Sequence, residues 1–178
     1  MSGFKSRCLK YFSLFIDKQF LAHKRQYLFQ CLLATLVVLL LLLAINVISN
    51  ELVIASIAST TFTIFTAPHH RLSHFRYVFG GYIVGILVGL FCYFLVLNKL
   101  TAIGWFFDIH QELVGAIAVG LSIFFMVILD LEHPPAASMS LALVIIPWSV
   151  ESLVITILFV LGLSLFRRLF GKHMISMI

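Results

Sequence analysis

The sequence predicts an all-α integral membrane protein, with six membrane segments arranged as two inverted halves of three. Hydrophobic residues make up 62% of the 178 positions and charged residues 11%, and the mean hydropathy is +1.12. A water-soluble domain of this composition would expose large apolar patches and aggregate. The apolar residues fall into six runs, of which the second and fifth are the shortest. A short middle segment is therefore expected in each half.

An interfacial helix is predicted before the first apolar run. Along residues 4–21 the apolar side chains recur at helical spacing, whereas the lysines fall largely on the rest of the helical wheel. This pattern is typical of an amphipathic helix in the membrane interface, and packing on a neighbouring subunit is the alternative. We expect residues 1–26 to form this cytoplasmic region, residues 27–168 the membrane domain and residues 169–178 a cytoplasmic tail.

The six apolar runs are expected to cross the membrane in turn. They cover residues 27–48, 52–67, 77–97, 113–129, 136–146 and 152–168. With a cytoplasmic N-terminus, six crossings place 11 of the 12 Lys and Arg residues in the cytoplasm and leave only Lys99 outside. The eleven are Lys5, Arg7, Lys10, Lys18, Lys24, Arg25, Arg71, Arg76, Arg167, Arg168 and Lys172. Because basic residues favour the cytoplasmic side, the charges predict a multi-pass protein of the cell inner (plasma) membrane with both termini cytoplasmic, and they disfavour four crossings with two re-entrant loops.

The second and fifth runs resemble each other. Counted back from Pro68 and from Pro147, the stretches "ASTTFTIFTAP" and "ASMSLALVIIP" align without a gap, and alanine, serine and proline recur at equivalent positions. Each stretch is the middle segment of a three-segment half, and the two halves run through the membrane in opposite directions. Paired short, proline-interrupted segments of this kind indicate an inverted-repeat transporter.

A stripe of small residues lies on the third run. Gly81, Gly85 and Gly89 recur every fourth residue, which allows the backbone of another helix to approach closely. That helix belongs either to the same chain or to a second subunit. We expect a homo-oligomer, because small bundles with glycine-striped spans often associate.

The stretch "EHPPAASMSLALVIIP" marks the start of the fifth segment. Proline is tolerated in the first turn of a helix, where its missing N–H has no partner. If this short helix spans only the outer half of the bilayer, its N-terminus lies near the midplane, where the start of the second segment near Ser59 would meet it. Two helix N-termini would then present partial positive charge and free N–H donors to one point. This arrangement predicts a small-anion site.

The residues expected to bind the anion come from both short segments. They are His133, Pro134, Pro135, Ser138 and Ser140, with Ser59, Thr60 and Thr61 from the other half. The hydroxyl groups would donate hydrogen bonds, and the histidine would add a proton or a positive charge. In the alternative interpretation the prolines only terminate a loop, and the hydroxyls bond to carbonyls of their own helices.

Two carboxylates, Asp130 and Glu132, precede the prolines. They would repel an anion, so we expect them to hold His133 as an imidazolium or to take up protons that travel with the anion; alternatively they face cytoplasmic water. The histidines of "PHHRLSHFR" are interpreted as part of a basic loop that touches lipid head groups, not as metal ligands. The net charge of +5 is interpreted as a topology signal beside anionic lipid rather than a nucleic-acid site. Without a nucleophile arrangement, phosphate loop or zinc spacing, we expect no enzyme activity, metal or cofactor.

These motifs resemble those of the HPP family of integral membrane proteins, which is named for its His-Pro-Pro triplet, here His133, Pro134 and Pro135. The upstream family pattern is a small-residue segment ending in Ala-Pro, a polar loop with arginine and a Gly-Gly pair. It is matched by Ala67, Pro68, Arg76, Gly80 and Gly81. The resemblance covers roughly residues 30–168 and implies a small multi-span transporter, since some relatives are linked to nitrite transport. Family members commonly carry glycine where this chain has Ala58 and Ala137, which leaves the substrate open.

The predicted function is membrane transport of a small inorganic anion such as nitrite, with the lipid bilayer, the anion and accompanying protons as partners. A passive anion channel is an alternative of the same class. A non-transporting partner subunit or membrane regulator is a second alternative. A membrane enzyme that acts on lipid or quinone through His133 with Asp130 or Glu132 is a third.

Overall fold

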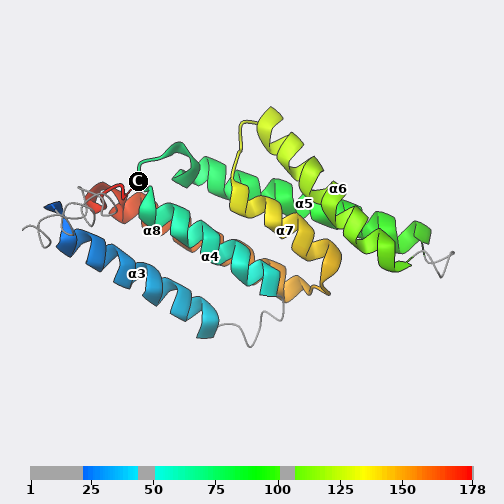
Figure 1. Ribbon diagram of the computed structural model, residues 1–178, viewed down its shortest axis with the longest axis horizontal. Helices are drawn as coiled ribbons and strands as arrows, with labels where there is room; N and C mark the ends of the chain where they lie inside the picture. Colours follow the sequence, from blue (N-terminus) through cyan, green and yellow to red (C-terminus); the bar gives the residue numbers. More distant parts are fainter. Residues whose placement is uncertain (1–21, 44–50, 101–106, 178) are drawn as a thin grey trace, which may run out of the picture.

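A computed structural model describes residues 22–43, 51–100 and 107–177 of the protein. Within these ranges the chain forms α-helices joined by short loops and two 3-10 turns, and no strand (Figure 1). The helices are α3 (Lys24–Leu43), α4 (Glu51–Thr66), α5 (Phe75–Leu100), α6 (Phe107–Ile128), α7 (Pro134–Ile145) and α8 (Val150–Phe170), with η2 (Arg71–Ser73) and η3 (Gly171–His173). The prediction of an all-α fold is confirmed. The predicted interfacial helix falls mainly on residues 1–21, outside the described residues.

The three helices of each half of the chain follow the same order of length, with a short helix between two longer ones. The short ones are α4, with 16 residues, and α7, with 12 residues, and longer helices flank each of them. Three of the described helices are long and apolar enough to cross a membrane, over Phe75–Leu95, Gln111–Ile128 and Val150–His173. At ~1.5 Å per residue, α7 covers about 18 Å of a ~30 Å hydrocarbon core. The predicted short middle segments are therefore present.

A proline follows the end of each short helix. α4 stops at Thr66 and α7 at Ile145, and Pro68 and Pro147 each come two residues later. Proline has no N–H to continue the helical hydrogen bonds, and it disfavours helical backbone in the residue before it. The two stretches that resemble each other in sequence therefore also end in the same way.

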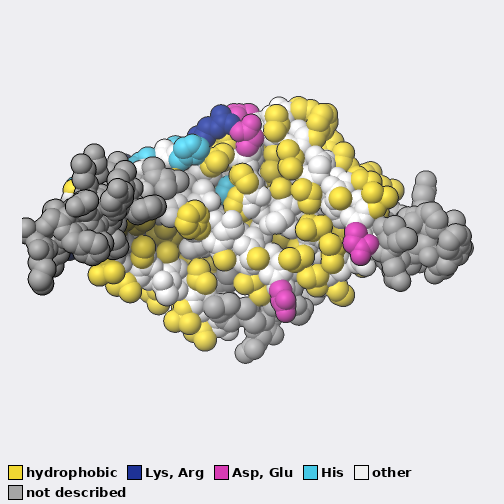
Figure 2. Space-filling view, viewed as in Figure 1, with side chains coloured by type: hydrophobic (Ala, Val, Ile, Leu, Met, Phe, Trp, Pro, Cys, Tyr) yellow, Lys and Arg dark blue, Asp and Glu magenta, His cyan; other side chains and the backbone are white. Residues whose placement is uncertain are grey.

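The short helix α7 lies at the centre of the bundle. It packs against α4, α5 and α6, while α5 also contacts α6 and α8, and α3 packs on α4 at the periphery (Figure 1). Most residues of α7 are buried, whereas α3, α6 and α8 turn large apolar side chains outward. Figure 2 shows apolar side chains spread over the visible face. An apolar surface of this extent is suited to contact with lipid.

The glycine stripe of α5 packs on α7 of the same chain. A Cβ atom at Gly85 would overlap the carbonyl oxygen of Ala136, and one at Gly89 would come within 2.9 Å of the Ser140 Cα. At Gly81 the added atom would lie 2.7 Å from the Cβ of His133, the residue that precedes α7. Only a residue without a side chain lets the two backbones come this close. The helix that the stripe accommodates is therefore the fifth segment.

The turn after α6 is a Schellman motif. The Leu131 N–H donates to the Met126 carbonyl at 2.8 Å, and the Asp130 N–H donates to the Val127 carbonyl at 3.2 Å. Asp130 takes the left-handed conformation that this motif needs, with φ of 52°, which aspartate tolerates better than most residues. The turn brings the Leu131 side chain against Gly80 of α5 and so directs the chain inward to α7.

Basic side chains gather at one end of the bundle, where the loop after α4 meets the segment after α8. Arg167 donates to the Pro68 carbonyl from Nε at 2.9 Å and from Nη2 at 2.7 Å. The His69 Nε2 bonds to the Met174 carbonyl at 2.9 Å, and because a carbonyl only accepts, this nitrogen carries the proton. Figure 1 shows that α4, α6 and α8 begin at the other end. Acidic residues occupy the first two turns of these helices, namely Glu51, Glu112 and Glu151.

Gln30 ties α3 to the rest of the bundle. Its Nε2 donates to the Phe65 carbonyl at 3.0 Å and to the Ile175 carbonyl at 3.1 Å, and its Oε1 accepts from the Ile175 N–H at 3.2 Å. The Met177 N–H also donates to the Thr66 carbonyl at 2.7 Å. One buried amide therefore joins α3, α4 and the segment that follows η3.

Gln30→Leu is expected to lower the free energy of unfolding by about 2–4 kcal/mol. It orphans the buried Phe65 carbonyl, at a cost of ~1–3 kcal/mol, and it removes the partner of the part-buried N–H and carbonyl of Ile175, which water can partly replace. Denaturant unfolding of the purified protein in detergent measures the loss. Gln26→Leu, which removes an exposed amide one turn earlier on α3, is the matched control and should change stability little. Equal unfolding midpoints for the two variants would show that the Gln30 contacts contribute nothing.

Candidate functional site

Buried polar side chains from α4 and α5 meet the loop before α7. The Thr60 Oγ1 lies 3.0 Å from the His133 Nε2 and 2.9 Å from the Tyr82 hydroxyl. The Tyr82 hydroxyl is 2.9 Å from the Ser56 Oγ, which donates to the Pro135 carbonyl at 2.6 Å. Each of the four side chains is at most 1% exposed. Together Ser56, Thr60, Tyr82 and His133 form the buried polar network.

Local sequence accounts for where these groups lie. Ser56 and Thr60 are one helical turn apart and share a face of α4. Tyr82 directly follows a glycine pair, which lets α5 approach the loop before α7. His133 stands at the N-cap of α7 with φ of −144° and ψ of 94° and makes no side-chain capping bond. Its ring bonds across to α4 instead.

The direction of the hydrogen bonds follows from what each group can donate. The His133 Nδ1 lies 3.1 Å from the Leu72 carbonyl, which only accepts, so Nδ1 carries a proton. In a neutral imidazole Nε2 is then an acceptor, and the Thr60 hydroxyl donates to it. Since the Ser56 hydroxyl donates to a carbonyl of α7, Tyr82 donates to Ser56 or to Thr60. Every member of the network has a partner without any charge.

Burial keeps His133 neutral. The residue lies in the loop between α6 and α7, and loss of hydration lowers the pKa of its imidazole to about 4, although the hydrogen bond with the Leu72 carbonyl acts in the opposite direction. The free protein therefore holds a neutral imidazole at pH 7. This result differs from the expectation that Asp130 and Glu132 hold an imidazolium, because both carboxylates pair with arginines.

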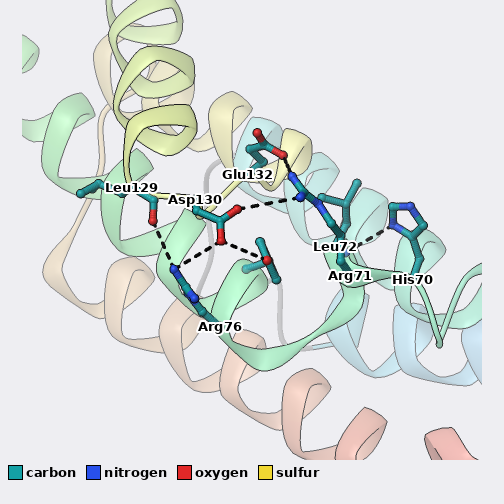
Figure 3. A network of polar contacts seen from close by, with 8 residues as sticks. His70, Arg71, Leu72, Arg76, Leu129, Asp130 and Glu132 are labelled. Atoms are coloured by element: carbon teal, nitrogen blue, oxygen red, sulfur yellow. Dashed lines mark hydrogen bonds and ion pairs between the residues drawn. The ribbon is translucent and has the colours of Figure 1, made fainter.

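An ionic cluster lies next to the buried polar network, since Glu132 directly precedes His133, and Figure 3 shows its contacts. Arg71 of η2 forms an ion pair with Glu132 and lies 3.9 Å from the Asp130 Oδ1, while the Arg76 Nη2 lies 3.4 Å from the Asp130 Oδ2. The Tyr77 hydroxyl donates to the Asp130 Oδ2 at 3.2 Å. Hydrogen bonding to Glu132 raises the pKa of Arg71. The ionic cluster, defined by these five residues, balances two carboxylates with two guanidinium groups.

One short loop links the ionic cluster to the buried polar network. Leu72 supplies the carbonyl that accepts from His133, and its neighbour Arg71 pairs with Glu132, the residue before His133. Asp130 is exposed, whereas His133, three residues later, is buried. A shift of the surface ion pairs would therefore move the imidazole as well.

A groove of about 500 Å³ opens between α6 and α7 beside the network. Its polar lining residues are Glu132, His133 and Ser138, and the rest of the lining is apolar, with Met126 and Pro134 among it. His133 therefore takes part in the buried polar network and also lines an open space. A small solute in this groove would lie next to His133, whose side chain is at most 1% exposed.

The structure brings some of the predicted site residues together. His133 and Thr60 share a hydrogen bond, and the Pro135 carbonyl accepts from the network. Pro134 and Ser138 line the groove next to His133. These five residues lie where the N-terminal part of α7 and the loop before it meet α4, although the Ser138 hydroxyl donates to the Pro135 carbonyl of its own helix at 2.7 Å.

Three predicted residues lie apart from this site. The Ser140 hydroxyl donates to the Ala137 carbonyl at 2.8 Å, and the Thr61 hydroxyl donates to the Ile57 carbonyl at 3.0 Å. Both acceptors belong to the residue's own helix, as in the alternative interpretation of the hydroxyls. Ser59 is exposed.

The predicted helix start near Ser59 is wrong. α4 begins at Glu51 and continues without a break to Thr66, because the stretch "ASTT" contains no proline or glycine to interrupt it. The first turn of α7 lies against the middle of α4, at Ser56 and Thr60. The two helix N-termini therefore do not face one point.

The expected free N–H donors at the start of α7 are also missing. Pro134 and Pro135 take its first two positions and have no N–H. The N–H of the third, Ala136, donates to the His133 carbonyl at 2.9 Å. The helix start still carries partial positive charge, but the polar hydrogens of this site come from side chains.

Sequence reasoning missed two members of the network, Tyr82 and Ser56. Tyr82 lies in an apolar run rich in aromatic residues, which are ordinarily packing or lipid-facing. Ser56 precedes the stretch that aligns with the fifth segment. Its spacing of four residues from Thr60 was the available signal, since it places two hydroxyls on one helix face. Among the described residues, no three His, Cys, Asp or Glu side chains are placed to hold a metal ion.

A family model described as "HPP, transmembrane region" matches residues 21–171 of the chain. The match includes α3 through α8, and both the buried polar network and the ionic cluster lie within it. No curated protein matches, and no solved structure matches.

Proposed function

The chain belongs to the HPP transmembrane family, and on this premise we propose that it transports a small inorganic anion such as nitrite across the membrane, together with a proton. The observation that carries the proposal is the buried polar network, which lies inside a bundle with an apolar outer surface. Buried polar and ionisable groups are costly in such a bundle and mark ion and substrate pathways. Its four side chains are the ones we assign to the pathway.

The network suits an anion that binds together with a proton. An anion beside His133 would raise the pKa of the imidazole, because opposite charges stabilise each other in a low dielectric. A protonated imidazole would donate from Nε2 to Thr60, and the Thr60 hydroxyl would turn to the Ser56 carbonyl, 3.1 Å away. The same groups therefore satisfy both protonation states of His133.

The route to the network passes the ionic cluster and the groove. Arg71 and Arg76 offer positive charge at the surface, and their ion pairs with Asp130 and Glu132 offset the repulsion of an anion by the carboxylates. Protonation of these carboxylates during transport is the second way in which a proton would accompany the anion. The groove between α6 and α7 then gives access to His133.

Two inverted halves, α3–α5 and α6–α8, are the architecture that we propose for transport. Ser56 meets Pro135 and Thr60 meets His133, so α4 and α7 pass each other in opposite directions. Rocking of one half against the other would expose the site to each side in turn. From the positive-inside rule we propose that the basic end lies at the cytoplasmic face of the cell inner membrane and that the chain begins and ends in the cytoplasm.

Anion flux into liposomes that contain the purified protein tests the proposal. Nitrite, nitrate, formate and chloride are compared with and without a proton gradient. We expect saturable uptake that selects among these ions and rises with an inward proton gradient. Thr60→Val removes the hydroxyl bonded to His133 and should lower flux at least tenfold, about 1.4 kcal/mol or more. Thr61→Val, which removes a buried hydroxyl bonded only within α4, is the matched control and should keep flux.

Each other outcome has a distinct meaning. A linear, pH-independent flux would assign the protein as a passive channel. Equal losses of flux in Thr60→Val and Thr61→Val would show that transport does not depend on the buried polar network. Folded protein that moves none of the four anions would contradict the proposal and favour a non-transporting partner subunit or regulator.

A further inference from the structure

A groove between α3 and α8 has a basic end and an apolar length. At the basic end of the bundle, a pocket of about 350 Å³ has polar lining from Arg25, Gln26, Gln30 and His173. A second pocket, of about 380 Å³, lies between the same two helices and is lined by apolar residues. Phe166 lines both pockets. The two pockets therefore adjoin at Phe166, and together they make up the groove between α3 and α8.

The dimensions of the groove match one lipid leaflet. On α3 its apolar lining runs from Phe29 to Leu40, which at ~1.5 Å per residue is about 16 Å. Half of a ~30 Å hydrocarbon core is ~15 Å. A polar end followed by an apolar stretch as long as one leaflet is thick matches the head group and acyl chain of a phospholipid.

The charge at the polar end suits an anionic head group. No carboxylate lines this pocket, and no described carboxylate forms an ion pair with Arg25 or His173. Lys24 and Lys172 are their sequence neighbours and add to the positive potential. Basic pockets between membrane helices bind anionic lipid head groups through this kind of complementarity.

We propose that this groove binds one anionic diacyl phospholipid, with its phosphate at Arg25 and His173 and an acyl chain along α3 and α8. The lipid would fill a space that the protein leaves open, since α3 packs mainly on α4. It would thereby fasten α3 to the bundle at the end where Gln30 also holds it. The inference does not depend on transport, because binding is measured without flux.

Native mass spectrometry of the full-length protein tests the head-group contact. The detergent-purified protein is incubated with equal amounts of phosphatidylglycerol and phosphatidylcholine, and the lipid retained per protein is counted. We expect one phosphatidylglycerol to be retained in preference. Arg25→Gln should weaken its retention about fivefold, the effect of one basic contact near the membrane surface. Lys24→Gln removes the same charge from a neighbour that does not line the pocket and should weaken it much less.

A second pair of variants tests the apolar length of the groove. Gly162 lines it, and a Cβ there meets no atom within 4 Å, so Gly162→Leu should fold and fill the groove. Gly120 is equally open but lies on α6, outside the groove, which makes Gly120→Leu the matched control. We expect Gly162→Leu to lower lipid retention at least fivefold and Gly120→Leu to leave it unchanged.

Several results would overturn the proposal. Equal retention of the two lipids would show that the groove does not select an anionic head group. Equal losses of phosphatidylglycerol retention in Arg25→Gln and Lys24→Gln would show that the phosphate does not lie at Arg25. A lipid-free dimer that Gly162→Leu dissociates would assign the groove to a second copy of the chain. Lipid-free monomeric wild type would likewise show that no phospholipid occupies it.

Discussion

Gly85→Ala is expected to lower the free energy of unfolding by roughly 1–3 kcal/mol, the reverse of the usual effect of alanine in a helix. The new Cβ would overlap the Ala136 carbonyl oxygen and lie 3.3 Å from the carbonyl carbon. The start of α7 cannot easily move aside, because two of its residues are held by hydrogen bonds to α4. These are His133, at the N-cap, and Pro135, in the first turn. The overlap would force α5 and α7 apart at the buried polar network.

Unfolding of the purified protein by SDS in mixed micelles measures this effect. Gly120→Ala is the control, since Gly120 has no atom within 4 Å of an added Cβ. There the substitution should raise stability by ~0.5–1 kcal/mol, because glycine loses more conformational entropy than alanine in a helix. Shifts of the same sign in both variants would mean that α7 does not pack on the glycine stripe.

His133→Ala is expected to lower the free energy of unfolding by roughly 3–5 kcal/mol, since it leaves a cavity and orphans buried partners. The Leu72 carbonyl loses its donor, the Thr60 hydroxyl loses its acceptor at Nε2, and the Tyr82 ring loses the imidazole whose centroid lies 5.9 Å from its own. Anion flux should be lost in the same variant. His23→Ala, at an exposed position just before α3, is the control for both measurements.

The same imidazole gives the protein a specific sensitivity to acid. His133 has a pKa of about 4 in the folded protein against 6.5 when unfolded, so between these values the unfolded chain binds more protons. The stability that comes from keeping His133 neutral is therefore complete above pH 6.5 and is lost as the pH falls to 4, a change on the order of 3 kcal/mol. Unfolding midpoints of the wild type and His133→Gln across this range measure it.

The difference between these two proteins isolates the imidazole, because every other ionisable group is present in both. We expect the wild type to lose stability relative to His133→Gln as the pH falls. Parallel pH profiles would show that the folded protein accommodates a charged His133. In that case His133 would not be held neutral by burial, and the proposed binding of an anion together with a proton, which relies on a neutral ring, would be rejected as well.

Much of the fold was predictable because it depends on local properties. Long apolar runs form helices wherever no proline intervenes, and the positions of Pro68, Pro134 and Pro147 accounted for the ends of α4 and α7. The glycine stripe was recognisable as a place of close approach. The helix that packs against it was not predictable, because a row of glycines indicates only that another backbone comes close and not which one.

The candidate site was predictable only in part. His133 and Thr60 were named from sequence and do meet, but the assumed geometry of two facing helix N-termini was wrong. The error came from treating the small polar residues near Ser59 as a helix start. A run of serine and threonine remains helical when its hydroxyls bond back to its own carbonyls, as Thr61 does.

The sequence by itself determined that this protein is helical, apolar on its surface and basic at one end, and where its short helices stop. The tertiary structure decided which hydroxyls join the buried polar network and which serve only their own helix. That choice depends on how α4 is rotated against its neighbours. Thr60 faces Tyr82 and His133, residues 22 and 73 positions away in sequence, while Thr61, the next residue, points to another side. A hydrogen bond between distant segments exists only once packing has brought both partners to one place, and no local pattern contains that information.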